Sequence, residues 1–140
     1  MVFLRDITKK VGANAGKVWT TLDVHGPLTF SNLLKNTKLS LNDLYVAIGW
    51  LARENKICKN GSYYQLGETN LTNLVGENAG KVWNILNSQE EASISSISKL
   101  TQIKIQDAYS AVGWLAREDK ISREIKNKNQ FLYKLNKPQN

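Results

Sequence analysis

The sequence has one cysteine, two prolines and one histidine among its 140 residues, and it has no long apolar run. A single cysteine cannot form an intramolecular disulfide, which is typical of proteins in reducing compartments. No apolar stretch approaches the roughly 18 residues of a membrane span. Residues 1–10 interleave charged and apolar side chains, unlike a signal peptide. We therefore expect a cytoplasmic protein with no membrane-spanning segment, associated with the nucleoid if it binds DNA.

Side chains that carry catalysis or bind metals are also scarce. His25 stands beside Gly26-Pro27, where a solvated turn residue is expected, and Cys58 stands alone. Metal binding needs several histidine, cysteine or carboxylate ligands together, and the sequence shows neither such a cluster nor a nucleophile with a base. We expect no enzyme, no metal, no cofactor and no small-molecule substrate.

Residues 12–17, Gly-Ala-Asn-Ala-Gly-Lys, invite comparison with a phosphate-binding loop. The spacing is one residue short, Val18 stands where a hydroxyl should bind magnesium, and no apolar strand precedes the segment. The simpler interpretation is the start of a helix, in which Gly16 and Gly80 permit close packing.

An internal repeat accounts for most of the chain. Residues 11–57 align without a gap on residues 75–121, and 23 of the 47 pairs are identical. We therefore predict two domains, residues 1–68 and residues 69–140, joined by a short segment near residues 67–74. Each unit is just large enough to support a core of its own.

Each unit reads as helix, short strand, helix, turn, helix and hairpin. In the first unit, apolar spacing predicts a helix over about 14–24, a second helix capped by Ser31 and a third over 41–54 capped by Ser40. Asn60-Gly61 lies between two β-prone runs and predicts a hairpin. The second unit repeats this order, with its longest helix over 105–119 and a longer hairpin over 121–135. The fold class is α+β, mainly α with small β-hairpins: two tandem winged helix-turn-helix domains.

The repeated motifs resemble those of a known family. G-E-N-A-G-K-V-W at 76–83 and G-W-L-A-R-E-D-K-I at 113–121 are similar to motifs of small prokaryotic winged helix-turn-helix domains of largely unassigned function. This resemblance implies the fold over nearly the whole chain. It implies nucleic-acid binding by analogy with winged helices in general.

The charge favours a polyanionic partner. The net charge is +7, and residues 120–137 hold six basic side chains and one acidic one. Lysines at the tip of a wing can lie along the DNA backbone or enter the minor groove, and a hairpin charged against aggregation is the alternative. Arg123, Lys126 and Lys128 are the wing residues expected to contact DNA.

The third helix of each unit is the expected groove reader, because a helix-turn-helix places this helix in the major groove. Its outward positions predict a set of DNA-contacting residues: Asn42, Tyr45, Val46, Arg53, Gln106, Tyr109, Ser110 and Arg117. Val46 and Gly49 are poor DNA contacts, however, and each helix carries a single cation. A protein partner for one helical face is therefore the alternative.

Trp50 and Trp114 lie next to the apolar stripe of these helices but not squarely on it. Each tryptophan could extend its own core, form an interface between repeats or between chains, or contact a base. The leading hypothesis is a tandem winged-helix protein that binds double-stranded DNA mainly through phosphates, as a transcription regulator or an architectural protein. The alternative is a protein-interaction module, including a homodimer, that uses the third helices and the tryptophans.

Overall fold

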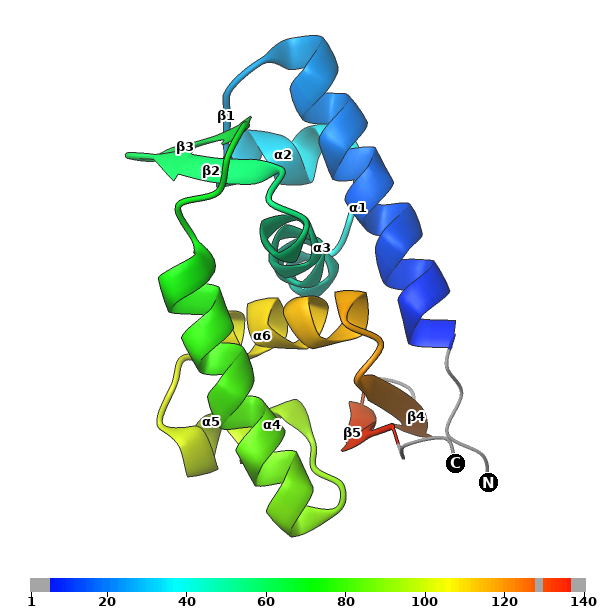
Figure 1. Ribbon diagram of the computed structural model, residues 1–140. Helices are drawn as coiled ribbons and strands as arrows, with labels where there is room; N and C mark the ends of the chain where they lie inside the picture. Colours follow the sequence, from blue (N-terminus) through cyan, green and yellow to red (C-terminus); the bar gives the residue numbers. More distant parts are fainter. Residues whose placement is uncertain (1–5, 128–129, 137–140) are drawn as a thin grey trace.

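The computed structural model describes residues 6–127 and 130–136, and it shows the expected helices and hairpins in the expected order (Figure 1). The first repeat contains α1 (Asp6–His25), β1 (Leu28–Thr29), α2 (Phe30–Thr37), α3 (Leu41–Arg53), β2 (Ile57–Asn60) and β3 (Tyr63–Leu66). The second repeat contains η1 (Thr72–Gly76), α4 (Glu77–Gln89), α5 (Ile94–Thr101), α6 (Ile105–Arg117), β4 (Ile121–Asn127) and β5 (Gln130–Leu135). The α+β class with two winged units is therefore confirmed.

The first helix is longer than predicted. It begins at Asp6 and not near Asn14, because Ile7 and Val11 continue the buried stripe of Ala15, Val18 and Leu22 toward the N-terminus. Gly12 to Lys17 therefore lies inside a helix and forms no phosphate-binding loop. The extra turns reach the second repeat, which sequence periodicity alone did not reveal.

The caps of the short helices follow ordinary side-chain chemistry. Thr29, and not Ser31, caps α2 by accepting a hydrogen bond from the Asn32 amide at 3.2 Å. Ser40 caps α3 as predicted, accepting from the Asp43 amide at 3.1 Å. Each third helix then ends before a residue with positive φ, Asn55 at 61° and Asp119 at 56°.

The two hairpins form the wings. β2 and β3 pair around a turn at Gly61, whose φ of 58° suits glycine, and β1 adds a third antiparallel strand beside β3. β4 and β5 form a longer two-stranded wing with an irregularity between Ile125 and Asn127. A single bridge from Ala92 to Tyr133 stands where the first repeat has β1.

The apolar core consists of two clusters, one centred on each repeat, and both clusters also draw residues from the opposite repeat. Ile7, Val11 and Val46 of the first repeat belong to the cluster of the second. Leu71, the repeat counterpart of Ile7, packs against the cluster of the first. This reciprocal exchange makes the two units an internal pair with approximate twofold symmetry.

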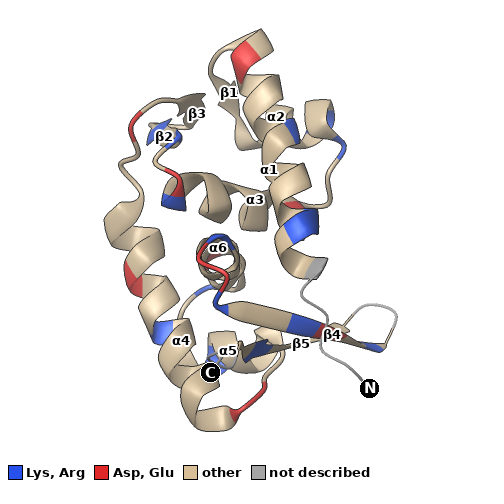
Figure 2. Cartoon of the chain, turned by 45° about the vertical axis from the view of Figure 1, so that its right-hand side comes forward, with Lys and Arg blue, Asp and Glu red and all other residues tan. Residues whose placement is uncertain are grey.

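The symmetry is visible in the arrangement of the elements. In Figure 2, half a turn about the line of sight approximately exchanges α1 with α4 and the wing at upper left with the wing at lower right. The third helices, α3 and α6, cross at the centre and make the most extensive contact between any two elements. Among the described residues, no helix has the length and apolar character needed to cross a bilayer.

Candidate nucleic-acid interface

The crossing of α3 and α6 is a backbone contact. A Cβ atom built on Gly49 would lie 1.8 Å from the carbonyl oxygen of Ser110, and one on Gly113 would lie 1.8 Å from that of Val46. No side chain fits in that space, so only glycine permits the observed approach. The helical faces expected to enter a DNA groove are therefore packed against each other.

The tryptophans lie on either side of this crossing. The ring of Trp50 lies 3.2 Å from a Cβ atom built on Gly12. The ring of Trp114 lies 3.2 Å from a Cβ atom built on Gly76. Both rings are partly buried, and each packs against both core clusters. Each tryptophan thus extends its own core and also contributes to the contact between repeats.

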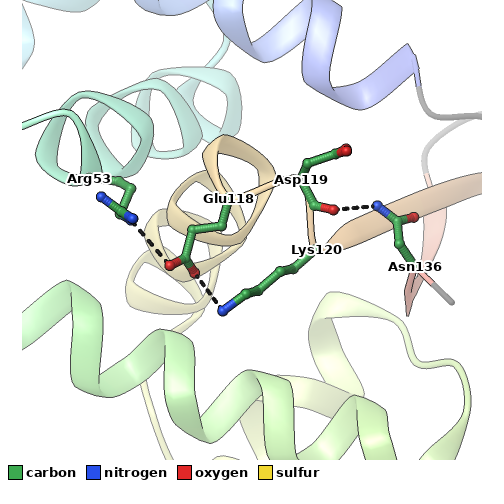
Figure 3. Close-up of polar contacts among 5 residues, drawn as sticks. All are labelled: Arg53, Glu118, Asp119, Lys120 and Asn136. Atoms are coloured by element: carbon green, nitrogen blue, oxygen red, sulfur yellow. Dashed lines mark hydrogen bonds and ion pairs between the residues drawn. The ribbon is translucent and has the colours of Figure 1, made fainter. Parts of the chain in front are cut away.

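Two reciprocal ion pairs bind the C-terminal ends of the third helices together. Arg53 Nε lies 3.1 Å from Glu118 Oε2, and Arg117 Nε lies 3.0 Å from Glu54 Oε2. Figure 3 shows the first pair, in which Glu118 also meets Lys120 at 3.5 Å. The arginines are nearly half exposed, so each pair adds little to stability, but together the pairs favour one register between the helices.

The same arginines lie against the tryptophans of the opposite repeat. The guanidinium carbon of Arg53 lies 5.6 Å from the ring centroid of Trp114, and that of Arg117 lies 5.6 Å from Trp50. Both side chains that were expected to read bases are thus held by a carboxylate and an indole of the other repeat.

Two further predicted base contacts are buried. Val46 is 6% exposed and Ser110 is 7% exposed, and both lie where the two helices meet. Ser110 Oγ donates a hydrogen bond to the carbonyl oxygen of Tyr45 at 3.2 Å. Neither side chain can reach a base edge while α3 and α6 are paired, because the other helix covers it.

The N-terminal ends of the third helices remain accessible. Asn42 and Gln106 are exposed, whereas Tyr45 and Tyr109 are half-buried. Tyr45 stacks on Phe30 with ring centroids 4.4 Å apart. Burial raises the pKa of Tyr109, and Asp43 of the opposite repeat raises it further. Because the Tyr45 carbonyl accepts a hydrogen bond from Ser110, the first half of α3 lies close to the second repeat.

The beginning of α6 likewise lies beside the first repeat, where residues of both repeats line a cavity of about 470 Å³. Its walls include Gln106 and Asp107 of the second repeat together with Lys59 and Tyr64 from the wing of the first. Each repeat therefore presents the beginning of its third helix beside the other repeat. This juxtaposition was not predicted, because it depends on how the two repeats dock.

The second wing separates its cations into different environments. Lys126 is exposed on β4, and Lys128 lies outside the described residues. Arg123 is only 8% exposed and lies 4.1 Å from the centroid of Phe131. Burial raises the pKa of Tyr133 to about 12, an effect that the charge of Arg123 opposes. Arg123 therefore contributes to the base of the wing, whereas Lys126 faces solvent.

Sequence reasoning gave a protein contact through the third helices and the tryptophans, within the chain or between chains, as the alternative to groove reading, and the residues of G-W-L-A-R-E carried that signal. Gly49, Arg53, Glu54 and their counterparts all lie in the repeated segment G-W-L-A-R-E. Of this segment, Arg53 and Arg117 were expected to contact DNA, whereas they pair with Glu118 and Glu54 of the opposite repeat, and these ion pairs were not predicted. No group of three potential metal ligands occurs among residues 6–127 and 130–136, and Cys58 is half-buried and free.

Comparison with known proteins agrees with the fold and with its duplication. A model of the winged helix-turn-helix domain DUF2582 matches the chain twice, over residues 7–66 and 69–134. An uncharacterized protein of Methanocaldococcus jannaschii is 36% identical over 67 residues, an alignment that covers 44% of this chain and 89% of that protein. The chain belongs to the DUF2582 family of winged helix-turn-helix domains, which it carries as a tandem pair.

Proposed function

We propose that the chain binds double-stranded DNA through its wings and the exposed beginnings of its third helices, mainly by phosphate contacts. The observation that carries the proposal is a second wing rich in basic residues, with Lys126 exposed on β4, on a fold that typically binds DNA without catalysing a reaction. A role in transcription regulation or in DNA architecture is consistent with such contacts.

The pairing of α3 and α6 argues for a particular mode of binding. Their crossing faces are covered, so insertion of either helix along its length would require the repeats to separate. Asn42 and Gln106 remain exposed for contacts at the groove edge, and Lys126 is free to approach the backbone. Phosphate contacts of this kind supply affinity and little sequence specificity.

The test is the salt dependence of binding by the full chain. With about four to six phosphates neutralised, log affinity for a fluorescent duplex should fall against log salt with a slope of roughly −4 to −5. Replacement of Lys126 and Lys128 by glutamate should flatten the slope on every duplex sequence. The matched control replaces Lys35 and Lys99 by glutamate. These exposed lysines occupy equivalent repeat positions on α2 and α5, so the control has the same net charge as the wing variant.

A second candidate function is supported by one observation, which is that the third helices and tryptophans are engaged in protein contacts. The chain would then act as an interaction module built around its internal pair. Failure to bind any duplex at about 50 mM salt would contradict the DNA proposal and favour this alternative. An equal loss of affinity in the wing variant and in its control would contradict the assignment of binding to the wing.

A further inference from the structure

Two surface grooves, here called the tryptophan grooves, lie beside the C-terminal ends of α3 and α6. One has a volume of about 380 Å³ and is walled by Trp19 and Trp50, and the other has about 320 Å³ and is walled by Trp83 and Trp114. Nine residues line each groove at equivalent repeat positions, and eight of the nine pairs are identical. Identity along the aligned repeats is only 23 of 47, so it is concentrated in the grooves.

Packing within the chain does not explain the floor of these grooves. A Cβ atom on Gly16 or Gly80 would meet no atom within 4 Å. Nothing in the chain packs closely on either glycine, contrary to what the sequence suggested. A glycine inside a helix destabilises it relative to alanine. Both glycines are nevertheless present, each three residues before a tryptophan that is 39% exposed in α1 and 37% exposed in α4. These features are typical of a surface that another backbone approaches closely.

The two grooves are continuous with the contact between the repeats. Trp50 and Trp114 form the inner walls and also pack against both core clusters. Glu54 and Glu118 line the grooves and accept the reciprocal ion pairs from the opposite repeat. Because Glu54 and Glu118 belong both to the grooves and to the ion pairs between the repeats, both grooves lie at the C-terminal ends of α3 and α6.

We propose that the tryptophan grooves are the contact surface for a second copy of this chain. An occupant that fills both grooves at once must present two matching groups related by the same twofold arrangement. The chain itself presents such groups, because this face carries two partly exposed indoles, Trp19 and Trp83, and two glycines with open space at the Cβ position. A face of this kind is complementary to a copy of itself, as twofold interfaces require. This inference goes beyond DNA binding and does not depend on it.

The charges of this face make a distinctive prediction about salt. Four cationic side chains and two carboxylates surround the grooves: Arg53, Lys56, Arg117, Lys120, Glu54 and Glu118. Two such faces repel each other weakly over their net positive charge, and salt screens that repulsion. Self-association should therefore strengthen with salt, whereas phosphate binding weakens.

The test is sedimentation velocity of the full chain over about 5 to 200 µM, at low salt and near 0.5 M salt. We expect a concentration-dependent change from 15.8 kDa to twice that mass, with more dimer at high salt. Replacing Gly16 and Gly80 by glutamine fills both hollows with a polar side chain that helices tolerate. This variant should raise the dimer dissociation constant at least about tenfold, and circular dichroism should show an unchanged fold.

The matched control places glutamine at Val24 and Ser88, which are equivalent exposed and uncharged positions on the same helices but outside the grooves. This control should dimerise as the natural chain does. A natural chain that stays monomeric up to about 200 µM would overturn the proposal. A dimer that survives both the glycine replacements and the change of Trp19 and Trp83 to alanine would also overturn it, because the contact would then lie elsewhere.

Discussion

At the scale of single residues, glycine has opposite roles at different positions of the same repeat. Gly49 and Gly113 lie where helix backbones touch, whereas Gly16 and Gly80 face open space. The residue type and its occurrence in both repeats are the same in the two cases. The atoms around each Cβ position distinguish a glycine needed for packing from a glycine on the surface. The same substitution, glycine to alanine, should therefore have opposite effects on stability at the two kinds of position.

Replacing Gly49 by alanine should lower the free energy of unfolding by about 3 kcal/mol, because the new methyl group collides with the Ser110 carbonyl and separates the helices. Replacing Gly16 by alanine should instead raise that free energy by about 0.4–1 kcal/mol, because alanine restricts the unfolded chain and meets no neighbour. Urea denaturation of the two variants measures both changes. Equal stabilisation by the two alanines would contradict the observed crossing of α3 and α6.

At the scale of elements, the third helix performs a different task from the one its position in the motif suggests. α3 and α6 follow a helix and a turn, as groove-reading helices do, but their central faces are closed by mutual contact. Their first residues and the adjoining wings remain exposed. A helix with one apolar face toward its own core and another toward a second helix accounts for the small number of cations on α3 and α6.

Replacing Trp50 or Trp114 by alanine should cost about 3 kcal/mol of stability, at the lower end of the range for tryptophan because both rings are only partly buried. DNA affinity that depends on the wing should be largely retained in the folded fraction. Trp19 is the matched control, since it is 39% exposed and its replacement should cost clearly less. Normal stability with abolished DNA binding would instead indicate that the two tryptophans contact bases.

At the scale of the whole molecule, the two repeats behave as a covalently linked pair. Ile7 and Val11 of α1 pack into the second cluster, and Leu71 packs into the first. Two repeats linked in one chain need no association from dilute solution, so the pairing is favoured at any concentration. The proposed contact through the tryptophan grooves would bring two such pairs together.

Residues 1–68 expressed alone should unfold cooperatively, because this unit contains a complete apolar cluster. Without the second repeat, the crossing face of α3 with Val46 and Gly49 is uncovered, and we expect it to pair with the same face of another fragment. The midpoint of thermal unfolding should therefore rise with fragment concentration. A disordered fragment would show that the first repeat is stable only when it is docked on the second.

The sequence by itself determined the duplication, the order of the elements and the winged helix-turn-helix class. Those features are local: apolar spacing, a Ser40 cap and an Asn60-Gly61 turn specify helices and hairpins through contacts between near neighbours. The tertiary structure alone decided which face of each third helix is covered. Val46 and Ser110 were predicted to face outward because they point away from the core of their own repeat. They are buried instead, because each is covered by the third helix of the other repeat, 64 positions away in the sequence. Periodicity in the sequence shows that a helical face consists of apolar or small residues. It does not show what packs on that face, because the packing depends on how the two complete units dock.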